Sequence, residues 1–227
     1  MLSGIQEFFQ YAASISPALW DGLLVTLQLF AITLIVSLPL GLIISLGGIS
    51  KFRPLRGVVS IYTWVLRGTP LMLQLFFVYY ALPYICPWLV LDRFPAAVVA
   101  FILNYAAYFA EIFRGGIQSI DKGQYEACKT LGFTYSQTMK RIIIPQTAKR
   151  VLPPISNETI TLMKDTALAV VISVPDMLKA AKDAVNRDTD ATAFFIVAII
   201  YLALTLIMTF IFRKLEHRYS FGEQKGN

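Results

Sequence analysis

The chain has 227 residues, of which 56% are hydrophobic and 15% are charged, and its mean hydropathy is +0.62. A soluble domain carries about 25% charged residues, so this composition excludes an ordinary soluble protein and indicates an integral membrane protein. The net charge of +6 lies between apolar stretches rather than in one basic patch with interleaved aromatic residues, and we therefore expect no nucleic-acid partner.

Four segments are apolar and long enough to cross a hydrocarbon core of about 30 Å as helices. Residues 1–22 contain no Lys or Arg and are expected to form an outer or interfacial segment that precedes the first span. The four spans are expected at residues 23–46, 57–82, 96–114 and 191–212, and a tail of residues 213–227 follows the last one. The second span is interrupted only by Arg67 and Pro70.

A fifth span is expected at residues 151–174, although this segment contains several charged residues. Such a helix has to face protein or a water-filled cavity instead of lipid. Lys and Arg concentrate in residues 47–56, in residues 114–150 and in the tail, whereas the other connections have few or are balanced by Asp. Five spans place all three basic segments in the cytoplasm and the N-terminus outside. Four spans would place residues 114–150 and the tail on opposite sides of the membrane, although both are basic. The sequence therefore predicts an all-α protein with five transmembrane helices.

This topology places Cys86 outside and Cys128 inside the cell. A disulfide between them is therefore not expected, and two separated cysteines do not form a metal site.

The cytoplasmic loop of residues 121–145 is too long and too rich in helix formers to be a plain connection. Asp121 is a suitable N-cap for a first short helix, which Gly132 would end, and Ser136 is a suitable cap for a second helix, which Pro145 would follow. Apolar side chains project from this corner, namely Leu131, Phe133, Met139 and Ile143. The loop is either a docking surface for a partner or a surface hairpin without one.

One run in this loop resembles the "EAA" loop of ATP-binding-cassette (ABC) importer permeases. The family pattern is Glu-Ala-Ala, three residues, Gly, nine residues, Ile-x-Leu-Pro. The chain matches it at Glu126, Ala127, Cys128, Gly132, Ile142, Ile144 and Pro145, with Cys128 in place of Ala and Ile144 in place of Leu. Two further stretches resemble the polar amino-acid branch, which includes the histidine, arginine, lysine, glutamine and cystine permeases. These stretches are Arg67-Gly68-Thr69-Pro70-Leu71, followed by Gln74-Leu75, and Ser156-Asn157-Glu158, followed by Leu162-x-Lys164-Asp165-Thr166. The resemblance extends from about residue 21 to the end of the chain.

This resemblance implies a type I ABC importer permease in a bacterial inner membrane. Besides membrane lipid, it implies three protein partners: a dimer of ABC ATPase subunits, a second permease subunit, and an extracellular or periplasmic substrate-binding protein. The sequence has no Gly-x-x-x-x-Gly-Lys-[Ser/Thr] phosphate loop, so Mg-ATP would bind the ATPase partner and no cofactor is expected in this chain. Coupling to ATP hydrolysis would pass through Glu126, Ala127, Cys128, Gly132, Ile142 and Pro145.

Helical spacing places polar residues of two predicted spans in stripes. Asn157, Glu158, Thr161 and Asp165 share one face, and Asn104, Tyr108 and Glu111 share another. An amino acid needs a carboxylate or carbonyls for its ammonium group and N–H or O–H donors for its carboxylate. We expect Glu158 to hold the ammonium group or a cationic side chain, and Asn104, Asn157 or Arg67 to hold the carboxylate. The predicted substrate-binding residues are Asn104, Tyr108, Asn157, Glu158, Thr161, Asp165 and Arg67.

Each of these residues has a structural alternative. Glu111 and Arg114 suit an intrahelical ion pair, Lys164 and Asp165 suit pairing between subunits, and Arg67 suits the carbonyl groups that a proline kink frees. The asparagines and Glu158 suit hydrogen bonds between helices. At the level of function, the alternative is a self-sufficient secondary transporter, but such proteins usually have more spans and internal repeats. A membrane enzyme is disfavoured because the sequence contains no metal-ligand cluster and no nucleophile motif. The transported amino acid and the identity of the partner permease stay open.

Overall fold

The computed structural model describes residues 2–220, and every regular element in this range is a helix. The long helices are α1 (Leu2–Gly48), α2 (Arg53–Gly68), α5 (Arg93–Gln118), α8 (Ile144–Asp165) and α10 (Thr192–Ser220). The shorter ones are α3 (Leu71–Phe76), α4 (Leu82–Ile85), α6 (Lys122–Thr130), α7 (Tyr135–Thr138) and α9 (Met177–Asp188). Two π-helical segments, η1 (Phe77–Ala81) and η2 (Met139–Ile143), and one 3₁₀ segment, η3 (Thr166–Ile172), join neighbouring helices. The predicted all-α class is confirmed.

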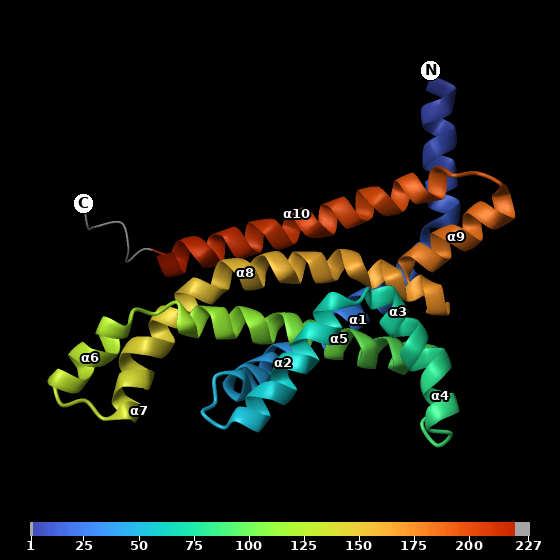
Figure 1. Ribbon diagram of the computed structural model, residues 1–227. Coiled ribbons are helices and arrows are strands. Elements are labelled where there is room, and N and C mark those ends of the chain that lie inside the picture. The colour runs from blue at the N-terminus through green and yellow to red at the C-terminus, as the bar shows by residue number, and fades with distance from the viewer. Residues whose placement is uncertain (1, 221–227) are drawn as a thin grey trace.

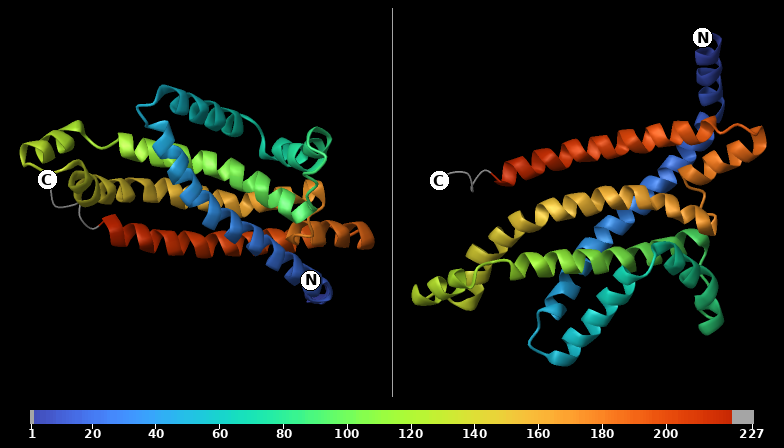
Figure 2. Two further views of the ribbon diagram at one scale, coloured as in Figure 1. Left: turned by 90° about the horizontal axis from the view of Figure 1, so that it is seen from below. Right: turned by 45° about the horizontal axis from the view of Figure 1, so that its top comes forward.

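Helix α5 lies at the centre of the fold, and α1 crosses it obliquely (Figure 2). The crossing is close because α5 presents small buried residues, and because α1 has Gly41 at the contact. A Cβ atom at Gly41 would lie 2.7 Å from the Cβ atom of Phe109. Small residues at such contacts let helices in a membrane pack by their backbones. Leu29, Phe101 and Tyr105 fill the core around this crossing.

Helix α1 runs from Leu2 to Gly48 without a break, although it contains Pro17 and Pro39. The interfacial segment expected at residues 1–22 is therefore continuous with the expected first span. No pair of glycines like Gly47-Gly48, where α1 ends, occurs near residue 22. A proline inside a long apolar helix removes one backbone hydrogen bond, and such a helix tolerates this loss.

The expected second span, residues 57–82, is not a single straight helix. Helix α2 and the helix pair that follows it meet at an angle of 105°. Between them, Thr69 is extended, with φ −119° and ψ 144°, because a residue before proline is disfavoured in the α region. Pro70 therefore ends one helix and starts another instead of producing a mild kink.

Three described helices are long and apolar enough to cross a membrane: Gln6–Gly48, Arg93–Gln118 and Thr192–Tyr219. A fourth is obtained if the bent pair formed by α2 and residues 71–85 counts as one span. Helix α8 is not in this set because its charged and polar residues lower its hydropathy. The last span continues past its expected end at residue 212, and residues 221–227 of the expected tail lie outside the described residues.

The helices give the molecule two distinct ends (Figure 1). At one end lie α6, α7 and the C-terminal end of α10, and at the other lie α4, α9 and the beginning of α10. Cys86 follows α4 and Cys128 lies in α6, so the two free cysteines are at opposite ends.

Candidate functional site: a polar cleft between α2, α5 and α8

A polar cleft lies where the bend between α2 and α3 meets α5 and α8. It consists of two adjoining cavities of about 480 and 460 Å³, which share Arg67, Tyr108 and Glu158 as lining residues. The other lining residues are Gly68, Thr69, Pro70, Leu71, Asn104, Tyr105, Thr161, Asp165 and Leu168 in the first cavity, and Glu111, Ile112, Pro154 and Asn157 in the second. All seven residues predicted to bind substrate therefore line one continuous cleft, although three separate stretches of the chain, residues 67–71, 104–112 and 154–168, contribute to its wall.

The bend at Pro70 leaves backbone carbonyl groups without helical partners, and two amide side chains bind them. The Gln74 side chain donates from Nε2 to the carbonyl oxygens of Leu66, at 2.8 Å, and Thr69, at 3.1 Å. Asn104 donates from Nδ2 to the Leu66 carbonyl at 3.1 Å and to Oε1 of Gln74 at 3.0 Å. The role that the sequence suggested for Arg67 at this kink thus belongs to Gln74 and Asn104. Because both N–H groups of Asn104 are used, this residue fixes the shape of the bend.

Arg67 points instead towards α5. Its guanidinium carbon lies 5.3 Å from the centre of the Tyr108 ring, and its Nη1 lies 3.8 Å from Oε2 of Glu111. Stacking on an aromatic face and a weak ion pair together hold a guanidinium group in place while leaving some of its N–H donors free. The intrahelical pair suggested for Glu111 and Arg114 is present, with the Arg114 Nε atom 3.1 Å from Oε2.

Two carboxyl groups face the cleft from α8, and they differ in their partners. The Tyr105 hydroxyl donates to Oδ2 of Asp165 at 2.7 Å. Glu158 is half-buried and has no hydrogen bond or ion pair within residues 2–220. A half-buried carboxylate without a partner favours binding of a cationic group. The cleft therefore presents a free carboxylate on α8 and an arginine at the end of α2, which are complementary to the two charges of a zwitterion.

The loop predicted to contact an ATPase forms a separate projection at the end of the molecule that carries α6 and α7 (Figure 1). Asp121 caps α6 by accepting a hydrogen bond from the Gly123 backbone N–H, as the sequence predicts. Leu131 and Tyr135 are 73% and 76% exposed at the corner between α6 and α7, whereas Cys128 and Ile143 are buried. The corner therefore presents apolar surface outward while its inner side is packed.

Three details of this loop differ from the sequence prediction. The N-cap of α7 is Thr134, which forms a capping box with Gln137, and not Ser136. Pro145 does not end the helix: the helical backbone runs from η2 through Ile144 into α8, and Pro145 lies in the first turn of α8. A side chain at Gly132 would meet no atom within 4 Å, so steric room is not what requires glycine. The requirement is its φ of +74°, which L-residues with a Cβ rarely adopt.

The comparison with known families decides the class of this protein. The family model described as "Binding-protein-dependent transport system inner membrane component" matches residues 37–221. The chain belongs to this family of ABC permeases. The family resemblance noted in the sequence is thereby confirmed.

Several amino-acid permeases are similar to this permease over most of their length. The arginine transport system permease protein ArtQ of Bacillus subtilis (strain 168) is 43% identical over 203 residues, which cover 89% of this chain and 92% of ArtQ. The L-cystine transport system permease protein TcyB of the same organism is 41% identical, with 88% and 87% covered. The glutamine transport system permease protein GlnP of Escherichia coli (strain K12) is 36% identical, with 89% and 93% covered.

Solved structures agree with this assignment. A crystal structure of an amino acid ABC transporter with histidines matches with a TM-score of 0.86 and 34% identity, and it covers 92% of this chain and 98% of the other. The inward-facing MetNI methionine ABC transporter matches with a TM-score of 0.70 at 16% identity, which supports the fold alone. The permease therefore has the type I ABC importer fold.

The sequence did not single out two residues that shape the cleft of this permease. Tyr105 was overlooked because an aromatic residue in an apolar helix is usually a core residue, and its hydroxyl partner Asp165 is 60 positions away. Gln74 appears in the sequence only as part of a motif. Its position four residues after Pro70 was the signal that could have predicted its hydrogen bonds to the carbonyl groups at the bend. Among the described residues, no group of three or more His, Cys, Asp or Glu is placed to hold a metal ion.

Proposed function

We propose that an amino acid crosses the membrane through the cleft between α2, α5 and α8. The chain is the permease component of a binding-protein-dependent ABC amino-acid uptake system. The observation that carries the proposal is the unpaired Glu158 carboxylate, which faces the same cleft as the Arg67 guanidinium. Glu158 binds the α-ammonium group, and the free N–H groups of Arg67 bind the α-carboxylate. Tyr108, Asn157, Thr161 and Asp165 contact the rest of the substrate.

The relatives indicate the class of substrate. Their names assign them to arginine, cystine and glutamine transport, and each of these amino acids has a polar or charged side chain. A cleft with three carboxyl groups, those of Glu111, Glu158 and Asp165, and one arginine fits this class, because polar side chains find hydrogen-bond partners there and a purely apolar side chain does not.

We further propose that five segments cross the membrane, with the N-terminus outside and the C-terminus in the cytoplasm. The fifth span is α8 together with η3, and its polar face is turned towards the cleft, which keeps it away from lipid. The positions of the loops support this topology. The basic α6–α7 loop and the C-terminal part of α10 lie at one end of the molecule, while α9 lies at the other (Figure 1).

The same proposal assigns three partners. An ABC ATPase dimer, which binds Mg-ATP, docks on the exposed corner formed by α6 and α7, through Glu126, Ala127, Gly132, Ile142 and Pro145. Cys128 is buried and packs the inner side of this corner instead. A second permease subunit closes the open side of the cleft, and a substrate-binding protein delivers the amino acid from outside. A rigid corner in the groove of an ATPase transmits closure of that ATPase to α8, because α8 begins directly after η2.

Reconstitution tests this function directly. The permease is incorporated into proteoliposomes with its co-purified ATPase and the purified binding protein, and uptake of labelled arginine, cystine and glutamine is measured. We expect uptake that needs both ATP and the binding protein. Uptake by the permease alone, driven by an ion gradient without ATP, would instead establish a secondary transporter.

A further inference from the structure

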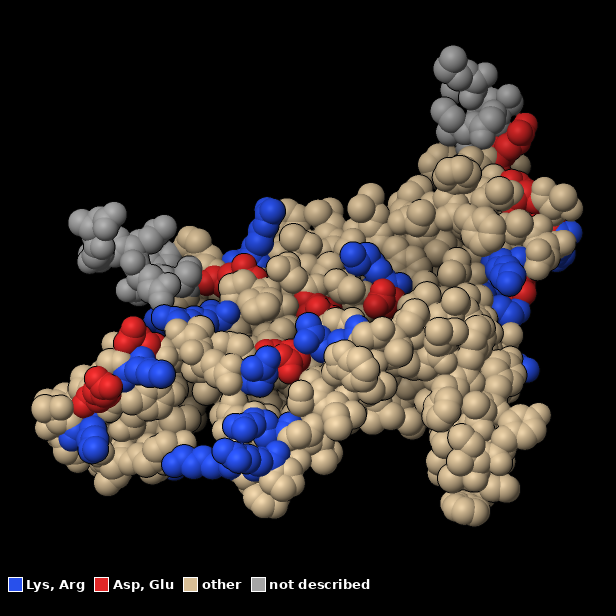
Figure 3. All heavy atoms as spheres, in the orientation of Figure 1, with Lys and Arg blue, Asp and Glu red and all other residues tan. Residues whose placement is uncertain are grey.

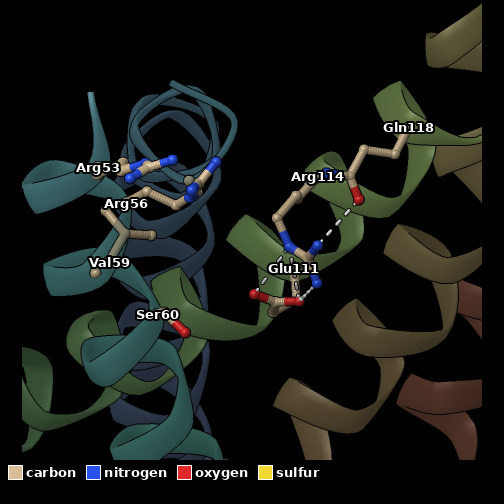
Figure 4. A pocket seen from close by; sticks show the side chains of 9 residues that line it. Arg53, Arg56, Val59, Ser60, Glu111, Arg114 and Gln118 are labelled. Carbon is tan, nitrogen blue, oxygen red and sulfur yellow. Dashed lines mark hydrogen bonds and ion pairs between the residues drawn. The ribbon is translucent and has the colours of Figure 1, made fainter. Parts of the chain in front are cut away.

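A third cavity lies outside the polar cleft, between the turn that connects α1 to α2 and the C-terminal half of α5. Its volume is about 510 Å³. It is lined by Gly48, Arg53, Arg56, Gly57, Val59, Ser60, Glu111, Arg114 and Gln118. Figure 4 shows Arg53 and Arg56 on the α2 side of this pocket and Arg114 and Glu111 on the α5 side. Neither the predicted substrate residues nor the ATPase-coupling loop accounts for these arginines.

The pocket carries uncompensated positive charge. Arg114 is neutralised by Glu111 and donates a further hydrogen bond to Gln118 at 3.0 Å. Arg53 and Arg56 have no ion pair among residues 2–220, and the sequence contains no Asp or Glu between Asp21 and Asp92. Lys and Arg gather over this turn in the space-filling view (Figure 3). Two adjacent guanidinium groups without counter-charges make this pocket a site for an anion.

Ion pairs lie where the pocket meets the cleft, because Glu111 lines both. The Glu111 carboxylate binds Arg114 and lies near Arg67, so its charge is already shared between two arginines. Arg53 and Arg56 line the pocket on one side of these ion pairs, and Tyr108 and Glu158 line the cleft on the other. An anion in the pocket is therefore not simply a second position of a substrate bound in the cleft.

The surroundings of the pocket identify the kind of anion. Directly after the two arginines, α2 exposes a row of apolar side chains, with Val58 65%, Ile61 63% and Trp64 75% exposed. The N-terminus of α2 has no side-chain cap, and its helix dipole adds to the positive charge of the arginines. A charged pocket at the start of a helix that also exposes large apolar side chains is complementary to a molecule that is anionic at one end and apolar at the other.

We propose that this pocket binds the phosphate group of an anionic phospholipid from the cytoplasmic leaflet. The phosphate lies between Arg53 and Arg56, and an acyl chain follows the exposed face of α2. Basic pockets at the cytoplasmic ends of transmembrane helices are suited to such headgroups, and each basic residue near the surface contributes about 1 kcal/mol to the attraction. This inference rests on the proposed orientation, in which the turn between α1 and α2 faces the cytoplasm.

Native mass spectrometry of the purified permease with its co-purified ATPase tests the inference. The probes are phosphatidylglycerol and phosphatidylcholine with the same acyl chains. We expect the wild-type complex to retain phosphatidylglycerol preferentially, and Arg53→Gln/Arg56→Gln to lower this preference by about 10- to 30-fold. Arg53→Lys/Arg56→Lys retains the charge and should retain most of the preference, which separates a charge effect from misfolding.

The matched control is Arg213→Gln/Lys214→Gln, which removes two positive charges from the exposed end of α10. It should leave the preference unchanged. The proposal is overturned if the two double Gln variants behave alike. It is also overturned if millimolar inorganic phosphate or a transported amino acid displaces the lipid, because the pocket would then hold a free anion. Lipid binding is measured without transport, so a wild-type complex that binds the lipid but takes up no amino acid would contradict only the proposed function.

Discussion

Asp176 is fully buried at the start of α9, next to Gly22 of α1. Its Oδ1 accepts a hydrogen bond from the Lys179 backbone N–H at 2.8 Å and so caps the helix, whereas its buried Oδ2 has no partner among the described residues. Burial raises the pKa of Asp176 to about 6, against the weaker opposing effect of the hydrogen bonds from the backbone and the charge of Lys179. In the proposed topology, Asp176 follows the fifth span and lies on the outer side of the membrane.

This raised pKa predicts how stability depends on pH. The folded protein keeps the Asp176 proton up to about pH 6, whereas the unfolded chain loses it near the ordinary aspartate pKa of 3.8. The contribution of this group to stability is therefore fully present below about pH 4 and decreases as the pH rises to about 6, by at most ~3 kcal/mol. Asp176→Asn keeps the cap and removes the titration. In detergent, we expect it to raise the Tm at pH 7.5 and to flatten the pH dependence between pH 4 and 6; an unchanged pH profile would contradict this account.

The free carboxylate of Glu158 gives a second prediction at this scale. Glu158→Gln keeps the size of the side chain but removes the charge that we propose pairs with the substrate ammonium group. A charge-assisted hydrogen bond contributes about 1.5–3 kcal/mol, so we expect the substrate concentration for half-maximal uptake to rise by about 10-fold or more. Basal ATP hydrolysis should change little. Glu216→Gln, the same change near the end of α10, is the control, and equal uptake by both variants would remove Glu158 from the binding site.

At the scale of elements, the corner between α6 and α7 depends on the backbone of one residue. Gly132 has a φ of +74° and open space around it, so a larger side chain is opposed by backbone strain of about 1–2 kcal/mol and not by packing. Gly132→Val should tilt the corner and reduce substrate-stimulated ATPase activity strongly, while the protein still inserts. Gly115→Val adds the same side chain at an open site without a positive φ and should retain activity. Normal coupling in Gly132→Val would argue against the docking role.

The contact between α5 and α8 gives a prediction about packing. A Cβ atom at Gly116 would lie 2.1 Å from Cγ1 of Val151, so Gly116→Ala should force these helices apart and cost about 1–3 kcal/mol. Val151→Ala removes the obstructing methyl groups. The double variant should therefore recover part of the Tm that Gly116→Ala loses, a coupling that a double-mutant cycle measures. Simple additivity of the two changes would show that this contact does not set the distance between the helices.

The parts of the site that the sequence predicts are those that depend on local features, namely helical spacing and proline. The stripe from Asn157 to Asp165 follows helical spacing, which is a local property, so its shared face was predictable. Pro70 was visible too, but a transmembrane helix often tolerates a proline, and the 105° bend depends on contacts that the sequence does not display. The pairing of Tyr105 with Asp165 is likewise a tertiary contact. Local chemistry thus identified the residues, and packing determined their partners.

At the scale of the whole molecule, the fold combines a lipid-compatible exterior with a polar interior. Helix α10 exposes a row of large apolar side chains that includes Phe195, Leu202 and Phe210, whereas the polar face of α8 lines the cleft. Arg67, Gly68 and Asn157 line the cleft and are exposed in this chain, so the cleft is open there. A second permease subunit on that side would enclose the cleft and shield its charges from lipid.

The central claim is that this cleft contains water and substrate during transport. It is tested most directly by labelling Thr161→Cys in a permease whose Cys86 and Cys128 are replaced by Ala, with Leu206→Cys on the exposed side of α10 as the control. With the reconstituted complex, a water-soluble thiol reagent should modify position 161 but not position 206, and a saturating transported amino acid should slow the reaction several-fold. Absence of modification at position 161, or a rate that the amino acid does not change, would contradict the account.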